Sequence, residues 1–190
     1  ISTVLEHQRF IQGPEVSAFE DALSSLLSAA HTVGVASGTD ALLVALMAEN
    51  IGPGDAVFLP AFTFTATAEV VLTCGATPIF CDVDGRDFNI DCDSLENLIK
   101  ETAKKGILKP KAIVSVDLFG QAADYRRLNS LSETYGLFLL ADAAQSIGGR
   151  VGNEWIGTLA QATCASFFPA KPLGCYGDGG AIITDDAERA

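Results

Sequence analysis

The chain has 190 residues, which at roughly 150 residues per domain corresponds to one globular domain. Hydrophobic residues make up 48% and charged residues 19%, which excludes a disordered chain and is enough for a core on both faces of a sheet. The net charge is −12, so the chain has no excess of cationic residues with which to bind nucleic acids or anionic membranes. We therefore expect neither as a partner.

Cysteine usage and the absence of sorting signals predict a compartment. The 5 cysteines form no C-x-x-C pair and 2 histidines are too few to support a zinc site, so we expect free thiols and no metal. No basic segment followed by an apolar one opens the sequence, and the longest apolar stretch, residues 41–48, is far shorter than a membrane span. The prediction is a cytoplasmic protein.

Helices and strands are predicted to alternate along the chain. Residues 14–27 start with a proline, which suits a first helical position, and keep one apolar stripe at helical spacing. Further helices are predicted at residues 41–48, 65–74, 95–102 (capped by Asp93 or Ser94) and 124–135. Strands are predicted at residues 32–36, 56–59, 77–83, 111–116, 137–141, 163–168 and 181–184.

This alternation, with strands that are apolar on both faces, predicts an α/β three-layer sandwich on a mostly parallel sheet. In such sheets the ligand crevice lies at the carboxyl ends of the strands. The motifs at residues 37–39 and 62–64, Asp142 and Lys171 all follow strands, so we expect them to gather at one edge. Residues 185–189 predict a helix start with no room to continue, and we interpret the sequence as truncated there.

Asp142 directly follows the apolar run LFLLA. A carboxylate at the end of a buried strand is costly unless it meets a cation or hydrogen-bond donors. Two interpretations stay open: a cap for a helix over residues 143–146, or a carboxylate facing the cationic ring nitrogen of a cofactor.

Lys171 lies between Pro169 and Pro172, with aromatic residues before it and glycines after it, which predicts a rigid irregular loop. A desolvated lysine becomes a nucleophilic amine that forms Schiff bases. The alternative is an ordinary solvated loop lysine.

Two other segments carry weaker signals. The Ser37-Gly38-Thr39 run precedes a helix and offers free N–H groups, two hydroxyls and the positive end of the helix dipole, which suits a phosphate or an ordinary N-cap. Phe62 and Phe64 follow a strand end, and we expect one to pack in the core and the other to support a planar ligand. Residues 177–180 lack the spacing of a dinucleotide loop, and no Ser-His-Asp arrangement is credible.

Together these features fit pyridoxal 5′-phosphate. This cofactor has an anionic phosphate, a planar ring, a ring nitrogen that must stay protonated and an aldehyde that reacts with an amine. The helix start, the aromatic platform, Asp142 and Lys171 provide one partner for each of these groups.

The chain resembles the DegT/DnrJ/EryC1/StrS family of pyridoxal-phosphate-dependent sugar aminotransferases, which have the aspartate-aminotransferase-like fold (fold type I). The resemblance runs in order through the blocks GPEV (13–16), SGTDAL (37–42), PAFTFTATAE (60–69), PIFCDVD (78–84), LFGQ (118–121), DAAQSIG (142–148) and SFFPAKPLGCYGDGGA (166–181). It implies that residues 1–190 form the cofactor-binding large domain, and that this domain is incomplete because the family continues into a further part and a small C-terminal domain.

The resemblance also implies roles for individual residues. They are Lys171 as the Schiff-base lysine, Asp142 as the partner of the ring nitrogen, Gln145 near the ring oxygen, Ser166 with Gly38 and Thr39 as the phosphate cradle, and Phe64 as the aromatic stacked on the ring, with Phe62 as a packing residue. Asp117 stands where many relatives carry a histidine.

The implied reaction is transfer of an amino group, usually from glutamate, to a keto group of a nucleotide-linked sugar. The last block is similar to the branch acting on UDP-3-oxo-N-acetylglucuronate in lipopolysaccharide synthesis. The family builds its site across a homodimer. Two alternatives stay open: a catalytically silent fragment that folds or dimerises without turnover, and a nucleotide-binding α/β module without pyridoxal chemistry.

Overall fold

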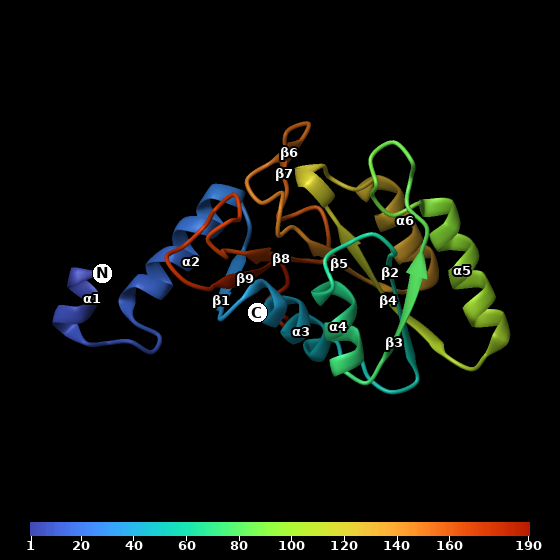
Figure 1. Cartoon of the computed structure of the whole chain (residues 1–190), viewed down its shortest axis with the longest axis horizontal. Coiled ribbons are helices and arrows are strands. Elements are labelled where there is room, and N and C mark those ends of the chain that lie inside the picture. Colours follow the sequence, from blue (N-terminus) through green and yellow to red (C-terminus); the bar gives the residue numbers. More distant parts are fainter.

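The computed structural model describes residues 1–190 as one sheet with helices on both faces (Figure 1). The helices are α1 (Ser2–His7), α2 (Pro14–Leu27), α3 (Gly38–Ala48), α4 (Ala66–Thr73), α5 (Cys92–Lys105) and α6 (Tyr125–Tyr135), with a 3₁₀ turn η1 (Leu118–Gly120). The strands are β1 (His31–Val35), β2 (Asp55–Pro60), β3 (Thr77–Cys81), β4 (Lys109–Val116), β5 (Phe138–Asp142), β6 (Arg150–Val151), β7 (Glu154–Trp155), β8 (Ala162–Ser166) and β9 (Gly180–Thr184).

The main sheet has seven strands in the order β1-β9-β8-β5-β4-β2-β3. The pairs β8–β5, β5–β4, β4–β2 and β2–β3 are parallel, and β9 runs antiparallel to both β8 and β1. The predicted mostly parallel α/β sheet is confirmed. The separate β6–β7 hairpin was not predicted, because each of its strands has only 2 residues and leaves no periodic signal.

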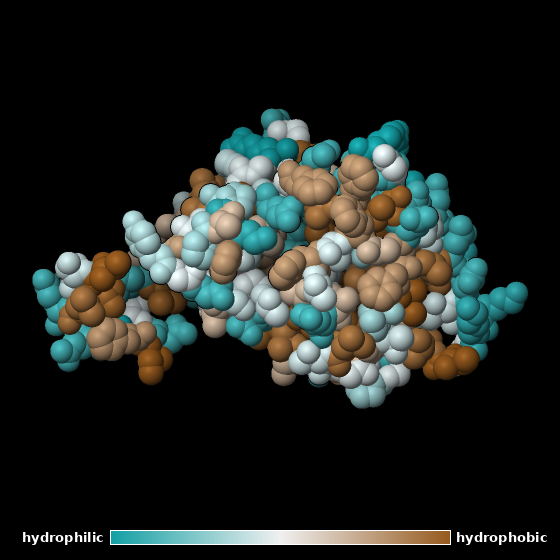
Figure 2. Space-filling model, in the orientation of Figure 1, coloured by the Kyte–Doolittle hydropathy of each residue, from teal (hydrophilic) through white to brown (hydrophobic).

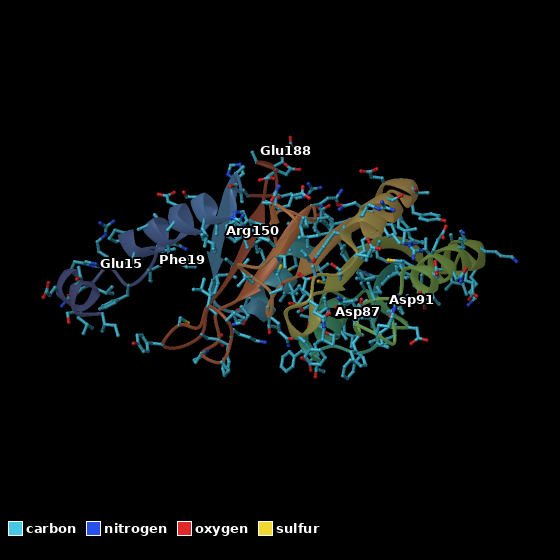
Figure 3. All side chains as sticks on the ribbon, turned by 90° about the horizontal axis from the view of Figure 1, so that it is seen from above. Glu15, Phe19, Asp87, Asp91, Arg150 and Glu188 are labelled. Atoms are coloured by element: carbon cyan, nitrogen blue, oxygen red, sulfur yellow. The ribbon has the colours of Figure 1, made fainter.

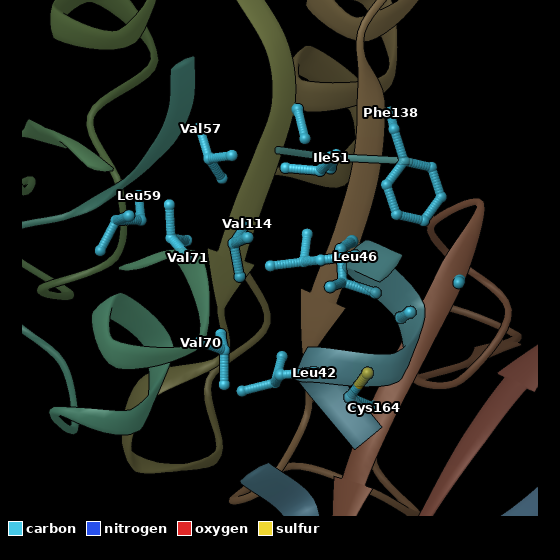
Figure 4. Close-up of a cluster of buried hydrophobic side chains, with 14 of the residues drawn as sticks. Leu42, Leu46, Ile51, Val57, Leu59, Val70, Val71, Val114, Phe138 and Cys164 are labelled. Atoms are coloured by element: carbon cyan, nitrogen blue, oxygen red, sulfur yellow. The ribbon is translucent and has the colours of Figure 1, made fainter. Parts of the chain in front are cut away.

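Side chains on the two faces of the sheet pack into different clusters, which makes three layers. Helices α3 and α4 cover one face, and α2, α5 and α6 cover the other. The alternation is visible on β5, where Leu140 packs with α3 and α4 while Leu139 packs with α5 and α6. Figure 4 shows the first of these clusters. Burying each such leucine contributes roughly 1.5–3 kcal/mol.

The ends of the predicted elements match to within three residues, and two predictions at helix starts are wrong. The cap of α5 is Asp91, whose carboxylate accepts the N–H groups of both predicted cap residues, Asp93 and Ser94. The helix start predicted at residues 185–189 is wrong, because this segment forms a turn in which the Arg189 N–H donates to the Asp186 carbonyl. A single turn does not offset the entropy of helix nucleation.

Helix α1 stands away from the sheet and buries none of its residues (Figure 1). The arm formed by residues 1–11 exposes the apolar side chains of Ile1, Leu5, Phe10 and Ile11, and brown side chains mark it in Figure 2. No sequence signal predicted α1, because its short run has no buried stripe. None of the helices is long and apolar enough to cross a bilayer.

Negative charge is spread over the molecule. In Figure 3, Glu15 on α2 and Asp87 and Asp91 before α5 lie toward opposite ends of the view.

All 5 cysteines are free thiols, as predicted.

Candidate active site

A cavity of about 420 Å³ lies at the carboxyl ends of the parallel strands. Its walls come from the start of α3, the loop after β2, the ends of β4, β5 and β8, and the loop between β8 and β9. All seven residues selected from the sequence line it: Gly38, Thr39, Phe64, Asp142, Gln145, Ser166 and Lys171. The expected gathering at one edge is therefore confirmed.

The start of α3 forms one wall of the cavity. Ser37 is an N-cap, as one interpretation expected: its Oγ accepts the Asp40 N–H at 3.0 Å. The N–H groups of Gly38 and Thr39, in the first turn, have no partner within the helix. A Cβ on Gly38 would lie 2.5 Å from the Ser166 Cβ, so only glycine fits there. Ser166 and the helix start thus present hydroxyl and N–H donors together, as an anion requires.

Asp142 is the last residue of β5 and only 7% exposed. Its Oδ1 accepts the Ala144 N–H at 3.2 Å and its Oδ2 accepts the Thr67 hydroxyl at 3.0 Å. Burial raises the pKa of Asp142 above its ordinary value. The two donors and the charge of Lys171 lower this pKa, but the effect of burial is larger. No helix forms over residues 143–146, so the first interpretation is wrong and the carboxylate caps only a turn.

Lys171 lies in the irregular loop between β8 and β9, as predicted. Its backbone N–H donates to the Phe168 carbonyl at 2.8 Å, which fixes the turn that carries it. The side chain is half-buried, lines the cavity and takes part in none of the ion pairs of the structure. Its ammonium group is therefore not committed to a surface carboxylate.

Gln145 reaches the cavity from the turn after β5. Its Oε1 accepts the Phe119 N–H at 2.6 Å, which leaves its side-chain nitrogen as a donor without a protein partner. Phe64, at the cavity wall, is 70% exposed. Phe62 is 51% exposed and packs against Phe88 and Phe119, with ring centroids 5.9 and 6.4 Å away. The expectation that one of the two rings lies in the core is wrong, because the loop carries both beyond the sheet edge.

Three further features were not found from the sequence. Thr67 on α4 reaches Asp142, and the sequence predicted only that residues 65–74 form a helix. Gly180 lies so close to the start of α3 that a Cβ would be 2.3 Å from the Ser37 carbonyl oxygen. Asp117 is fully buried under the site, where it accepts three hydrogen bonds from other residues. The glycine-rich run was the signal for Gly180, and the resemblance singled out position 117 without its contacts.

Solved structures that superpose on this chain are aminotransferases with an α/β fold. The structure of a DegT DnrJ EryC1 StrS aminotransferase from Brucella abortus superposes with a TM-score of 0.98 and 53% identity, covering 99% of this chain and 50% of that one. NtdA from Bacillus subtilis, solved with bound cofactor PMP, superposes with a TM-score of 0.89 and 34% identity, covering 99% of this chain and 41% of that one.

The chain belongs to the DegT/DnrJ/EryC1/StrS aminotransferase family, which matches residues 1–190. The UDP-2-acetamido-2-deoxy-3-oxo-D-glucuronate aminotransferase of Pseudomonas aeruginosa is 45% identical over 190 residues, which is 100% of this chain and 51% of that protein. The chain thus spans about half the length of the curated relatives it matches.

Proposed function

We propose that this chain is the cofactor-binding part of a pyridoxal-phosphate-dependent aminotransferase that acts on a nucleotide-linked sugar. One observation carries the proposal: a buried carboxylate, an uncommitted lysine and an anion-binding helix start share one cavity of about 420 Å³. A family whose relatives include a PMP-bound structure supports it.

The donor set of the cavity fits the cofactor. Gly38 and Thr39 N–H groups with the Ser166 hydroxyl would bind the phosphate, and the close approach that only glycine permits at position 38 forms the cradle. Asp142 would face the ring nitrogen and keep it protonated. When bound, pyridoxal phosphate supplies an aldehyde carbon and a ring that accepts electrons.

The remaining residues would bind and move protons. Lys171 Nζ would hold the aldehyde carbon covalently and, once displaced by the amine of the donor, accept a proton from one carbon and return it to another. The side-chain nitrogen of Gln145 would donate to the ring oxygen, since its Oε1 is already occupied by Phe119. Phe64 would cover one face of the ring.

The proposal for the sugar and the donor is supported by the names of relatives. The name of the Pseudomonas aeruginosa relative specifies a 3-oxo UDP sugar acid, so we propose a UDP-linked 3-oxo sugar as amino acceptor. We propose glutamate as donor, which the name of a 3-oxo-glucose-6-phosphate:glutamate aminotransferase of Bacillus subtilis specifies for that relative. Lipopolysaccharide or a related surface polysaccharide would then receive the product, and the reaction would take place in the cytoplasm.

We also propose a homodimer. The arm of residues 1–11 exposes Ile11 to 90% and Phe10 to 64%, and α1 buries none of its residues in its own subunit, where His7 bonds Glu15 at 2.9 Å. Apolar side chains presented in this way are typical of an interface, and a second copy of the chain is the partner. Sedimentation should show a dimer that Ile11→Glu dissociates; a wild-type chain that sediments as a monomer would contradict this.

The covalent step is tested by trapping. The chain is incubated with pyridoxal 5′-phosphate, reduced with borohydride and digested, and the mass of each lysine peptide is measured. The adduct is expected on Lys171 and absent from Lys171→Ala, whereas Lys104→Ala, an exposed lysine on α5, keeps it. An adduct that persists in Lys171→Ala, or is spread evenly over surface lysines, would leave only a nucleotide-binding module.

Turnover separates the remaining alternative. A chain that holds unreduced pyridoxal 5′-phosphate on Lys171 and converts it on addition of glutamate is an active transferase portion. A chain that holds the unreduced cofactor there but does not respond to glutamate is a silent portion, and then the rest of the protein is required for the reaction. The experiment is absorbance spectroscopy of the loaded chain before and after glutamate.

A further inference from the structure

Thr67 is the only side chain that donates a hydrogen bond to Asp142. It is fully buried on the first turn of α4, and its hydroxyl lies 3.0 Å from Oδ2 of an acid 75 residues away in sequence. Without it, that carboxylate oxygen has no donor from the protein, since the Ala144 N–H binds Oδ1.

A helical threonine usually makes a different bond. Its hydroxyl returns to the carbonyl four residues earlier, and Thr73 on the same helix does so with the Glu69 carbonyl at 2.8 Å. Thr67 is the second residue of α4, so the carbonyl four residues earlier lies before the helix, and the Thr67 hydroxyl turns to the carboxylate instead. Helix α4 therefore holds a polar group at a core-facing position because of Asp142 and not for its own capping.

The hydrogen-bond direction extends the contact to the cavity. The Thr63 and Thr67 oxygens lie 3.1 Å apart. A hydroxyl has one proton, and that of Thr67 is committed to Asp142, so Thr63 must donate to Thr67. Thr63 is half-buried and lines the cavity. The result is a chain of two hydroxyls, polarised toward the carboxylate.

We propose that Thr67, supported by Thr63, is a positioning residue that keeps Asp142 ionised and oriented for the ring nitrogen. The inference rests on the proposed function for its purpose, but the contact itself belongs to the chain alone. Donors to a buried carboxylate favour its charged form, and each donor polarises the next. Removing the Thr67 hydroxyl should thus favour protonated Asp142, which cannot hold a cationic ring.

Other groups act on the same carboxylate and are held constant in the test. Lys171 favours the charged form, whereas Asp117 disfavours it. The further titratable neighbours are Tyr125 on α6 and Cys164 on β8, the residue paired with Asp142 in the sheet. None of these is changed by a substitution at position 67 or 63.

The test is a carbon-13 NMR titration of the whole chain without cofactor, labelled at aspartate carboxyl carbons, with the Asp142 signal assigned by its loss in Asp142→Asn. Thr67→Val should raise the midpoint of this signal by about one pH unit. Thr67→Ser, which restores the hydroxyl, should return the midpoint to that of the wild type. Thr73→Val, on the exposed side of the same helix, should leave it unchanged.

Thr63→Val keeps the packing of α4 and should shift the midpoint in the same direction by a smaller amount, so the proposal stays testable even if Thr67→Val does not fold. The proposal would be overturned if the Asp142 midpoint stayed unchanged in whichever of Thr67→Val and Thr63→Val folds. A shift in Thr73→Val as large as in those variants would overturn it as well. Failure of the proposed function shows separately, as absence of an adduct on Lys171, and does not alter the titration.

Discussion

Two buried carboxylates lie at the ends of neighbouring strands and differ in their hydrogen bonds and in their access to the cavity. Asp117 follows β4 and Asp142 ends β5, and the Asp117 N–H donates to the Asp142 carbonyl at 3.1 Å. Asp117 is fully buried and accepts three hydrogen bonds, from the Ala123 N–H and the hydroxyls of Tyr125 and Ser146. Asp142 accepts two and faces the cavity.

The difference separates a structural acid from one available to a ligand. Burial raises the pKa of both carboxyls. Around Asp117 the donors close the site completely, and its bond to Ser146 ties down the turn that carries Gln145. Around Asp142 a face is left open, so a cation can still bind there. We therefore expect changes at Asp117 to act on stability and changes at Asp142 to act on cofactor binding.

The largest effect is expected from Asp117→Ala. It leaves three buried donors without an acceptor, so the free energy of unfolding should fall by about 3–5 kcal/mol. Asp142→Ala strands only two donors, beside a cavity that admits water, and should cost less than half as much. Urea denaturation of both variants checks the ranking; equal losses would mean that the two acids have the same structural role.

The next effect is on ligand binding. Asp142→Asn keeps the shape and one acceptor, so stability should change by less than about 1 kcal/mol. Cofactor affinity should fall about 10- to 100-fold, because the charge opposite the ring nitrogen is lost. Absorbance titration with pyridoxal 5′-phosphate measures it. Asp178→Asn, an exposed acid on the same cavity, is the control and should bind like the wild type.

Smaller losses are expected from the partners of Asp117. Tyr125→Phe and Ser146→Ala each remove one hydroxyl from a buried carboxylate, and each should lower the free energy of unfolding by about 1–2 kcal/mol. Together they should lose more than the sum if the three groups form one network. Additive losses in the double variant would show independent contacts.

The smallest effect is a pH slope. Because burial raises the pKa of folded Asp117 above its unfolded value, the folded chain holds the extra proton between the two values. The stability that Asp117 contributes is thus fully present below its pKa in the unfolded chain, and it is lost as the pH rises through its pKa in the folded chain. The stability difference between wild type and Asp117→Asn should decline over that window, by at most about 1.4 kcal/mol per pH unit. A stability difference that does not change with pH would mean that the pKa of Asp117 is not raised in the folded chain.

The sequence predicted the layers, the sheet type and the gathering of the strand-end motifs with Asp142 and Lys171, because apolar periodicity and such motifs depend on neighbours in the chain. Gln145 and Ser166 were selected only through the resemblance to the family. The sequence did not predict the contacts of Thr67 or Asp117, since both join residues that only folding brings together. The β6–β7 hairpin and α1 were missed because neither buries a periodic face. The roles of the cavity residues stay predictions until the trapping and titration experiments are done.

The antiparallel strand β9 has a consequence for the lysine. Ser166, which ends β8, is paired with Gly180, which begins β9, so residues 167–179 leave the sheet and return to it at one pair. Gly180 is also paired with Val35 at the end of β1. The Phe167 N–H donates to the Gly179 carbonyl at 2.8 Å next to this pair, so the segment that carries Lys171 is a loop closed at its base. Beyond the buried Phe167, which packs on Phe19, a change of length in this loop need not shift any strand, so the reactive amine can be re-aimed while the anion cradle beside it stays in place.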